Sequence, residues 1–241
     1  MTLVMTDSDL PLRIRSFVIR TGRLTDSQRA GWDVGFPKHG FTLSDHQFDW
    51  DLSFDVAGPR VLEIGFGMGD SLVAMADQNP ESRYLGIEVH TPGVGKLLAD
   101  VERRGIRNLK VFSDDAVQVL EDAIPVDSVD LMQIFFPDPW HKKRHHKRRL
   151  IQPDFVSLAV SRLSSGGHMH LATDWEPYAK HMMDVLSATA ALENVAGDRQ
   201  FSPRPESRPE TKFERRGHRL GHGVWDLLFT KRSDVVGKVT V

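Results

Sequence analysis

The chain has 241 residues, of which 40% are hydrophobic, and 31 Lys and Arg against 33 Asp and Glu give it a formal net charge of −2. This composition is typical of a globular protein and excludes a largely disordered or fibrous chain. No apolar stretch reaches the length of a membrane-spanning helix, and the N-terminus lacks the apolar core of a signal peptide. Without cysteine the chain has no disulfide, no thiolate nucleophile and no Cys-based metal site. We therefore expect a cytoplasmic protein without a membrane partner.

The first part of the chain, residues 1–55, shows no regular periodicity, because Gly31, Gly35 and Pro37 interrupt it. We expect an irregular N-terminal extension that is partly mobile. A single domain is expected to follow over residues 56–241.

From residue 59 onward short apolar runs alternate with amphipathic segments. The apolar runs predict strands over Arg60–Ile64, Tyr84–Ile87, Leu109–Phe112, Val129–Phe136, His168–Ala172 and Val224–Thr230. The amphipathic segments predict helices over Asp70–Gln78, Val94–Arg104, Ala116–Ala123, Asp154–Leu163 and Glu176–Ala190. Strands that alternate with helices of this length form right-handed βαβ units, so we expect an α/β fold with a mostly parallel sheet. Ligands bind at the carboxyl ends of such strands, and the polar motifs of this chain follow those ends.

A glycine-rich loop follows the first predicted strand of the domain. It contains Glu63, Gly65, Gly67 and Gly69 in the pattern E-x-G-x-G-x-G. Glycines at such a turn allow unusual dihedral angles and a close approach of the backbone to a ligand. The dinucleotide fingerprint G-x-G-x-x-G would place its third glycine at Asp70, so the spacing differs from that motif. A tight strand-to-helix connection is the alternative interpretation.

Acidic residues follow the next two predicted strands. Glu88 ends the second strand, and a carboxylate in that place accepts the hydroxyls of a ribose. Asp114 and Asp115 follow the third strand, where an acid accepts from an adenine amino group. Either aspartate is also a candidate N-cap of the following helix.

These three features resemble the class I S-adenosylmethionine-dependent methyltransferases. The resemblance implies a Rossmann-like fold, with a mostly parallel, doubly wound sheet of about seven strands whose last strand is antiparallel. It also implies S-adenosyl-L-methionine as cofactor. The implied contacts are Glu63, Gly65, Gly67 and Gly69 for the methionine part, Glu88 for the ribose, and Asp115 with Ala116 for the adenine.

A proline-rich motif, FPDPWHK, follows the fourth predicted strand and leads into the most basic segment of the chain. Prolines on both sides of Asp138 restrict its backbone. Asp138 offers an acceptor for guanine N1–H and its amino group, and Trp140 is large enough to stack on a base. From His141 to Arg149 the sequence is HKKRHHKRR, with six Lys or Arg and no acid, which favours docking onto a polyanion. The alternatives are a rigid structural loop and a solvated charged surface.

FPDPWHKKRHHKRR, together with TDWE (Thr173–Glu176), TKFE (Thr211–Glu214) and RSFVIRTGRLT near the N-terminus, is similar to the single-chain bacterial tRNA (guanine-N7-)-methyltransferase family. The resemblance implies transfer of a methyl group from S-adenosylmethionine to N7 of a guanosine in the tRNA variable loop (position 46). It implies Asp138 as the active-site residue, which is also counted among the cofactor contacts. The implied substrate contacts are Lys142, Asp174, Thr211, Lys212, Phe213 and Glu214, and the implied RNA contacts are Arg144, His145, His146, Lys147, Arg148 and Arg149.

The chemistry of guanine N7 fits these residues, because its lone pair attacks a methyl group without losing a proton. We therefore expect Asp138 to orient the guanine and to stabilise its developing positive charge. A methyltransferase for another RNA or DNA base and a non-catalytic RNA-binding module are the alternatives kept open, whereas the glycine spacing disfavours an NAD-dependent oxidoreductase. The histidines of the basic segment lack a nearby acid or cysteine, which favours a solvated cluster over a metal site. Both a monomer and a homodimer agree with the sequence.

Overall fold

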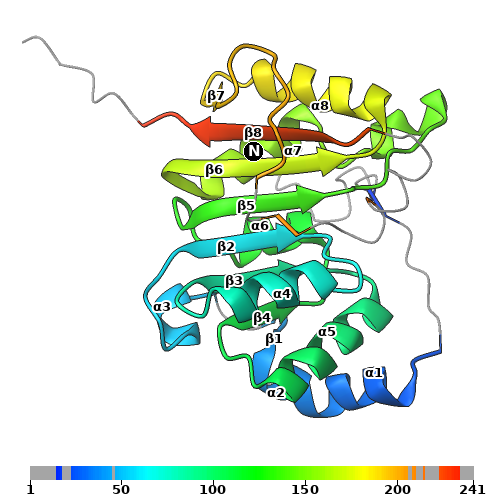
Figure 1. Cartoon of the computed structure of the whole chain (residues 1–241), viewed down its shortest axis with the longest axis vertical. Helices are drawn as coiled ribbons and strands as arrows, with labels where there is room; N and C mark the ends of the chain where they lie inside the picture. The colour runs from blue at the N-terminus through cyan, green and yellow to red at the C-terminus, as the bar shows by residue number, and fades with distance from the viewer. Residues whose placement is uncertain are drawn as a thin grey trace, which may run out of the picture.

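The strands form one eight-stranded sheet in the part of the chain that the computed structural model describes, which comprises residues 15–17, 23–44, 47–205, 208–209, 214 and 223–233. The strand order is β1-β4-β3-β2-β5-β6-β8-β7 (Figure 1). The strands are β1 (Gly40–Phe41), β2 (Arg60–Ile64), β3 (Arg83–Ile87), β4 (Leu109–Phe112), β5 (Val129–Phe135), β6 (Leu163–Thr173), β7 (Leu192–Asn194) and β8 (Trp225–Lys231). β8 runs antiparallel to both of its neighbours, and the other paired strands are parallel. The predicted fold class is therefore confirmed.

The central strands are apolar on both faces because helices cover both. In β2, Val61 belongs to one core cluster, whereas Leu62 and Ile64 belong to the other. This alternation follows from the two-residue period of a strand. β2 and β4 have the predicted bounds, whereas the edge strands β1 and β7 were not predicted, since two or three residues carry too little pattern.

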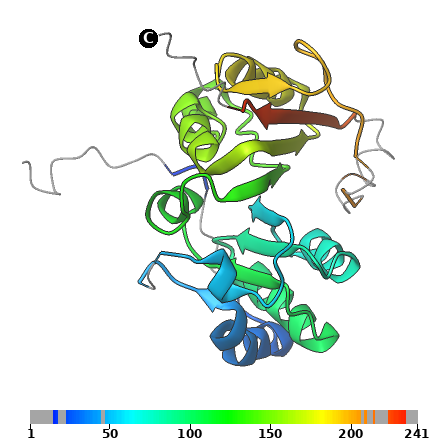
Figure 2. The ribbon, with the colours of Figure 1, turned by 90° about the vertical axis from the view of Figure 1, so that its left-hand side faces the viewer.

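Among the described residues, five helices cover the central strands in two layers. α4 (Asp70–Gln78) and α5 (Thr91–Arg104) pack on one face, and α6 (Ala116–Asp122), α7 (Pro153–Arg162) and α8 (Glu176–Ser187) pack on the other. Figure 1 shows α4 and α5 in front of the sheet, and Figure 2 shows helices on both sides of it. α5 begins three residues before its predicted start because Pro92 is tolerated in a first helical turn. No helix of the described segments has the length and apolarity needed to cross a bilayer.

The expectation that residues 1–55 are irregular is wrong for much of this segment. α1 (Asp26–Ala30), a π-helical turn η1 (Gly31–Gly35), α2 (Phe36–His39) and α3 (Trp50–Ser53) lie within it. The glycines are contact points with α5: a Cβ atom on Gly31 would lie 2.0 Å from the carbonyl oxygen of Gly95. Phe48 and Trp50 are buried in the same core cluster as Leu62, so residues on both sides of position 55 share one core.

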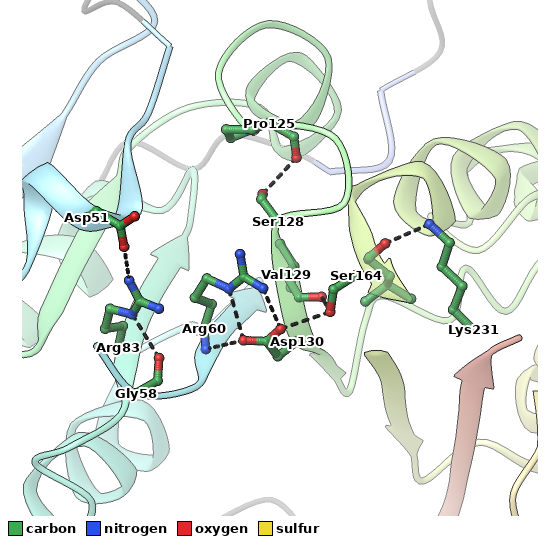
Figure 3. A network of polar contacts seen from close by, with 11 residues as sticks. Asp51, Gly58, Arg60, Arg83, Pro125, Ser128, Val129, Asp130, Ser164 and Lys231 are labelled. Atoms are coloured by element: carbon green, nitrogen blue, oxygen red, sulfur yellow. Dashed lines mark hydrogen bonds and ion pairs between the residues drawn. The ribbon is translucent and has the colours of Figure 1, made fainter. Parts of the chain in front are cut away.

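A polar network holds the amino-terminal ends of the central strands (Figure 3). Arg60 donates through Nε and a terminal nitrogen to Asp130, at 2.9 and 2.7 Å, and Ser164 Oγ donates to the same carboxylate at 2.8 Å. Arg83 similarly contacts Asp51 of α3 at 2.7 Å. Partial burial opposes ionisation of Asp130, but the hydrogen bonds from Arg60 outweigh it and lower the pKa of Asp130 to about 2. This network leaves the carboxyl ends of the strands free for other residues.

Candidate active site

A cavity of about 210 Å³ lies at the carboxyl ends of β2, β3, β4 and β5. The chain runs from β2 towards β4 on one side and from β5 towards β6 on the other, so the cavity lies where the strand order reverses. The polar residues that line it come from four separate segments. Its lining consists of Ser16, Phe17, Ile64, Gly65, Ile87, Glu88, Val89, Asp114, Asp115, Ala116, Phe135, Phe136, Pro137, Asp138 and Leu150.

The glycine loop after β2 adopts left-handed backbone angles at each of its three glycines. The φ angles of Gly65, Gly67 and Gly69 are 77°, 58° and 75°, which disfavour any residue with a side chain. A Cβ atom on Gly65 or Gly67 would meet nothing within 4 Å, whereas one on Gly69 would lie 2.7 Å from the side chain of Leu97. Gly69 is therefore a packing contact at the start of α4. The first two glycines leave their backbone accessible, and Gly65 lines the cavity.

Glu63 lies behind this loop and is 3% exposed. It does not line the cavity. Its Oε2 atom has no hydrogen-bond partner among the described residues, and Gln133, its partner in register on β5, has an Oε1 atom in the same situation. Burial and the nearby charge of Glu88 raise the pKa of Glu63 to about 8. Glu63 is therefore a buried carboxyl group with one unsatisfied oxygen, two residues before the first glycine of the loop.

Glu88 lines the cavity and is 9% exposed. Its Oε2 atom accepts a hydrogen bond from the backbone N–H of Gly67 at 2.7 Å. Its Oε1 atom accepts from the N–H groups of Val89 and His90, at 2.7 and 2.9 Å. The carboxylate is therefore held in one orientation between the glycine loop and the start of α5.

The acids after β4 also border the cavity. Asp115 caps α6, where its side chain accepts from the N–H of Val117 at 2.9 Å. Asp115 is thus confirmed as an N-cap and lines the cavity as well, together with Asp114 and Ala116. Burial raises the pKa of Asp114.

The Asp138 loop is bounded by two residues in the left-handed region. The φ angles of Phe136 and Trp140 are 52° and 45°, a conformation that costs energy for residues with bulky side chains. The backbone N–H of Phe136 donates to Ala172 on β6 at 2.8 Å. Arg149 Nε donates to the carbonyl oxygen of Pro139 at 2.9 Å. These contacts hold the loop in its strained form and leave the Asp138 side chain exposed at the cavity.

Trp140 is fixed by the protein itself. Its Nε1–H donates to the carbonyl oxygen of Ser16 at 3.0 Å, and the Arg148 guanidinium lies 4.4 Å from the centre of its ring. The interpretation of Trp140 as a structural residue therefore fits better than that of a free stacking surface. Ser16 and its neighbour Phe17 line the cavity, which sequence reasoning missed.

The basic segment contains a 3₁₀ helix, η2 (Lys143–Arg148), beside the Asp138 loop. Lys142, Lys143, Arg144 and Lys147 are exposed, whereas His145, His146 and Arg148 are half-buried. Arg149 differs from all of these because it is 4% exposed and its guanidinium lies 4.8 Å from the centre of the Tyr178 ring. A direct RNA contact would require Arg149 to leave the loop that it holds.

The loop after β6 approaches the same surface. Asp174 is exposed, and Trp175, at 37% exposure, precedes α8. The ring of His141 lies 4.3 Å from the Trp175 ring in an edge-to-face arrangement. This contact joins the loops that follow β5 and β6.

Glu214 is buried and forms an ion pair with Arg208. Its two carboxylate oxygens accept hydrogen bonds from Arg208, at 2.7 and 2.8 Å, and Glu214 is 2% exposed. The resemblance implies a substrate contact for Glu214, but its carboxylate is engaged by Arg208. Thr211, Lys212 and Phe213 lie outside the described residues. Sequence reasoning also missed Arg208, since nothing in its local pattern separates it from neighbouring arginines.

Comparison with known proteins identifies close sequence relatives. Residues 57–227 match a family model described as "Putative methyltransferase". A tRNA (guanine-N(7)-)-methyltransferase of Alcanivorax borkumensis is 54% identical over 221 residues, covering 92% of each chain. The protein of the same name from Pseudomonas aeruginosa is 52% identical over 231 residues, covering 95% of each chain. The chain also resembles that of Saccharophagus degradans, with 53% identity over 90% of this chain and 95% of the relative.

Solved structures with lower identity share the fold. The 16S rRNA methyltransferase KamB superimposes with a TM-score of 0.58 at 18% identity, over 78% of this chain and 95% of KamB. The cyclase SpnF superimposes with a TM-score of 0.53 at 15% identity, over 90% of this chain and all of SpnF. Because this fold serves different reactions, the assignment of chemistry rests on the close relatives and on the site.

Proposed function

Because the chain belongs to the tRNA (guanine-N7-)-methyltransferase family of S-adenosylmethionine-dependent enzymes, we propose that it methylates N7 of the guanosine at position 46 in the variable loop of tRNA. The observation that carries this proposal is the meeting of Glu88 and Asp138 in one cavity. Glu88 comes from the half of the sheet that contains the glycine loop, and Asp138 from the half that continues into the basic segment.

The cavity suits an adenosine-containing cofactor. Glu88 offers a preoriented carboxylate to a ribose hydroxyl, and Gly65 lines the same cavity. Asp115 and Ala116 border the place proposed for the adenine, and the apolar side chains of Ile87 and Phe135 line the same cavity. Glu63 would act from behind the glycine loop, where its unsatisfied Oε2 atom favours a hydrogen-bond donor.

S-adenosylmethionine supplies a methyl group on a sulfonium: the N7 lone pair forms the new C–N bond, and the electrons of the S–C bond return to sulfur. No proton is lost, so the enzyme needs no general base. Asp138 orients the guanine through its Watson–Crick edge and stabilises the positive charge that develops on the ring. The strained loop between Phe136 and Trp140 restrains the backbone that carries this carboxylate, which favours alignment of the reacting atoms.

The exposed cations beside the loop fit a folded tRNA. Lys142, Lys143, Arg144 and Lys147 are exposed and would contact phosphates around a base that enters the cavity. Asp174, exposed after β6, is proposed as a further substrate contact. An isolated nucleoside offers no phosphates to these residues, so it should react poorly. A tRNA substrate also agrees with a cytoplasmic location.

The decisive test is incubation of the purified protein with labelled S-adenosylmethionine and an unmodified tRNA transcript, followed by nucleoside analysis. We expect the label in N7-methylguanosine and expect no incorporation into a transcript in which only the guanosine at position 46 is replaced. Label on another base, an exocyclic amine or a ribose would contradict the N7 assignment. Continued incorporation into the substituted transcript would contradict the position.

A further inference from the structure

Arg208 is a fully buried cation that joins two carboxylates from different parts of the chain. Its side chain is 0% exposed. Nε and one terminal nitrogen donate to the two oxygens of Asp226 on β8, at 2.9 and 3.0 Å. The terminal nitrogens also donate to both oxygens of Glu214. The planar guanidinium thus forms a paired contact with each carboxylate, a geometry that a lysine cannot reproduce.

The network extends across the sheet. Asp226 Oδ1 also contacts His170 Nε2 of β6 at 2.7 Å, and the His170 ring lies 4.9 Å from the ring of Phe135. Burial opposes ionisation of Asp226, but the hydrogen bonds from His170 and Arg208 outweigh it and lower the pKa of Asp226. Asp226 therefore keeps its negative charge although it is buried between β6 and its hydrogen-bond partner Arg208.

The guanidinium also contacts the two residues that lead into the Asp138 loop. Its central carbon lies 5.7 Å from the centre of the Phe135 ring and 5.8 Å from that of Phe136. Both phenylalanines line the cavity, and Phe136 is the left-handed residue that directly precedes Pro137. Arg208 thus contacts Phe136 at the strained start of the loop. Phe136 lies two residues before Asp138 in the chain.

A buried ion network of this kind is a poor means of gaining stability, because desolvation of its charges cancels much of their attraction. Its directional contacts do, however, define a single arrangement of the groups that they join. Here those groups are Glu214, β8 and the Phe136 turn.

We propose that Arg208 is a positioning residue for methyl transfer, which holds Glu214 against β8 and supports Phe136 so that Asp138 meets the guanine in the reactive geometry. This rests on the function proposed above. Glu214 then acts through its contact with Arg208, and its carboxylate does not need to touch the substrate.

The principal variant is Arg208→Lys, which keeps the charge but loses the paired contacts. We expect kcat with tRNA to fall by about 10²-fold, the cost of a small misplacement of reacting groups. The KM for tRNA and the dissociation constant for S-adenosylmethionine should change less than about twofold, because the exposed cations and Glu88 are untouched. Arg199→Lys is the matched control, since Arg199 forms an exposed ion pair with Asp184, and its kcat should equal that of the wild type.

A second variant separates positioning from stability. Arg208→Met combined with Glu214→Met removes both charges together and leaves Asp226 with His170, so its melting temperature should recover relative to Arg208→Met alone. Its kcat should stay low. The proposal is overturned if Arg208→Lys keeps wild-type kcat, or if kcat recovers in the double variant together with the melting temperature. Absence of N7-methylguanosine with the wild-type protein would instead overturn the proposed function.

Discussion

The backbone N–H of Gly67 donates to Oε2 of Glu88 over 2.7 Å, and this bond joins the glycine loop after β2 to the end of β3. The other oxygen of Glu88 accepts two further backbone hydrogen bonds. An ionised carboxylate offers about four acceptor positions, so roughly one remains for a ligand. The protein therefore orients Glu88 before any ligand binds, and loop and acid form one unit.

Glu88→Gln should weaken the binding of S-adenosylmethionine by roughly 1.5–3 kcal/mol, because a charged acceptor is replaced by a neutral amide whose NH₂ group faces backbone donors. Isothermal titration calorimetry measures this change. Glu193→Gln, an exposed acid on β7, is the matched control and should bind normally. Unchanged affinity in Glu88→Gln would show that the cofactor does not use this carboxylate.

Asp138→Asn should lower kcat with tRNA by about 10²–10³-fold, because the amide lacks the charge that stabilises the methylated guanine. The dissociation constant for S-adenosylmethionine should stay nearly constant, and so should the melting temperature, since the side chain is exposed. Single-turnover kinetics at saturating tRNA would check the prediction. Near-normal turnover of Asp138→Asn at saturating tRNA would show that Asp138 has no role in the methyl transfer.

Lys147 and Arg149 are close in sequence but should behave differently. Lys147→Ala removes an exposed charge, and it should flatten the dependence of log tRNA affinity on log salt concentration by about 0.7–0.9 if one phosphate contact is lost. Filter-binding titrations over a range of salt concentrations measure this slope. An unaltered slope would favour the alternative interpretation, in which the basic segment is a solvated charged surface that does not contact tRNA.

Arg149→Ala should instead destabilise the fold by about 1–3 kcal/mol, because it leaves the Pro139 carbonyl without its donor and opens a space beside Tyr178. Urea unfolding measures the effect, and Lys147→Ala serves as the control that should not change stability. Equal stability of the two variants would contradict the structural role of Arg149.

Asp130 should make the protein sensitive to acid. Its pKa is about 2 in the folded state against 3.8 for the ordinary group, so its stabilisation is fully present above pH 4 or so and is lost as pH falls towards 2. Because the side chain is about one-third exposed, we expect a screened contribution of about 1 kcal/mol. Asp130→Asn should therefore be less stable at pH 7, with a difference that closes near pH 2. A stability difference between Asp130→Asn and the wild type that stays constant with pH would contradict the lowered pKa of Asp130.

Glu63 should change the pH dependence of stability in the opposite direction to Asp130, because its pKa is raised in the folded state. Its pKa is about 8 in the folded state and 4.5 for the ordinary group, so the unfolded chain loses this proton first and stability falls as pH rises from about 4.5 to 8. Glu63→Gln cannot ionise, so without cofactor its free energy of unfolding should exceed that of the wild type by on the order of 4 kcal/mol at pH 8 and match it near pH 4. Urea unfolding at both pH values tests this, and parallel stability curves would refute it.

Elements whose residues form a regular local pattern could be predicted from the amino-acid sequence. The apolar runs of β2 and β4 and the amphipathic repeat of α4 are periodic over consecutive residues, so they indicated these elements with their bounds. The alternate glycines and the acids after the strands likewise predicted the edge of the sheet at which the cavity lies, because parallel strands bring their carboxyl ends to one edge.

The packing of distant segments determines which side chains of each motif face the cavity and which stabilise the protein. Trp140 bonds to Ser16 across 124 positions of the chain. Arg149 is buried, whereas Lys142, Lys143, Arg144 and Lys147 of the same basic segment are exposed. Glu214 is paired with Arg208, which in turn meets Asp226 on a strand that begins more than ten residues later. Such contacts depend on how distant segments pack, and a charged residue has the same local pattern whether it ends in a buried pair or in water.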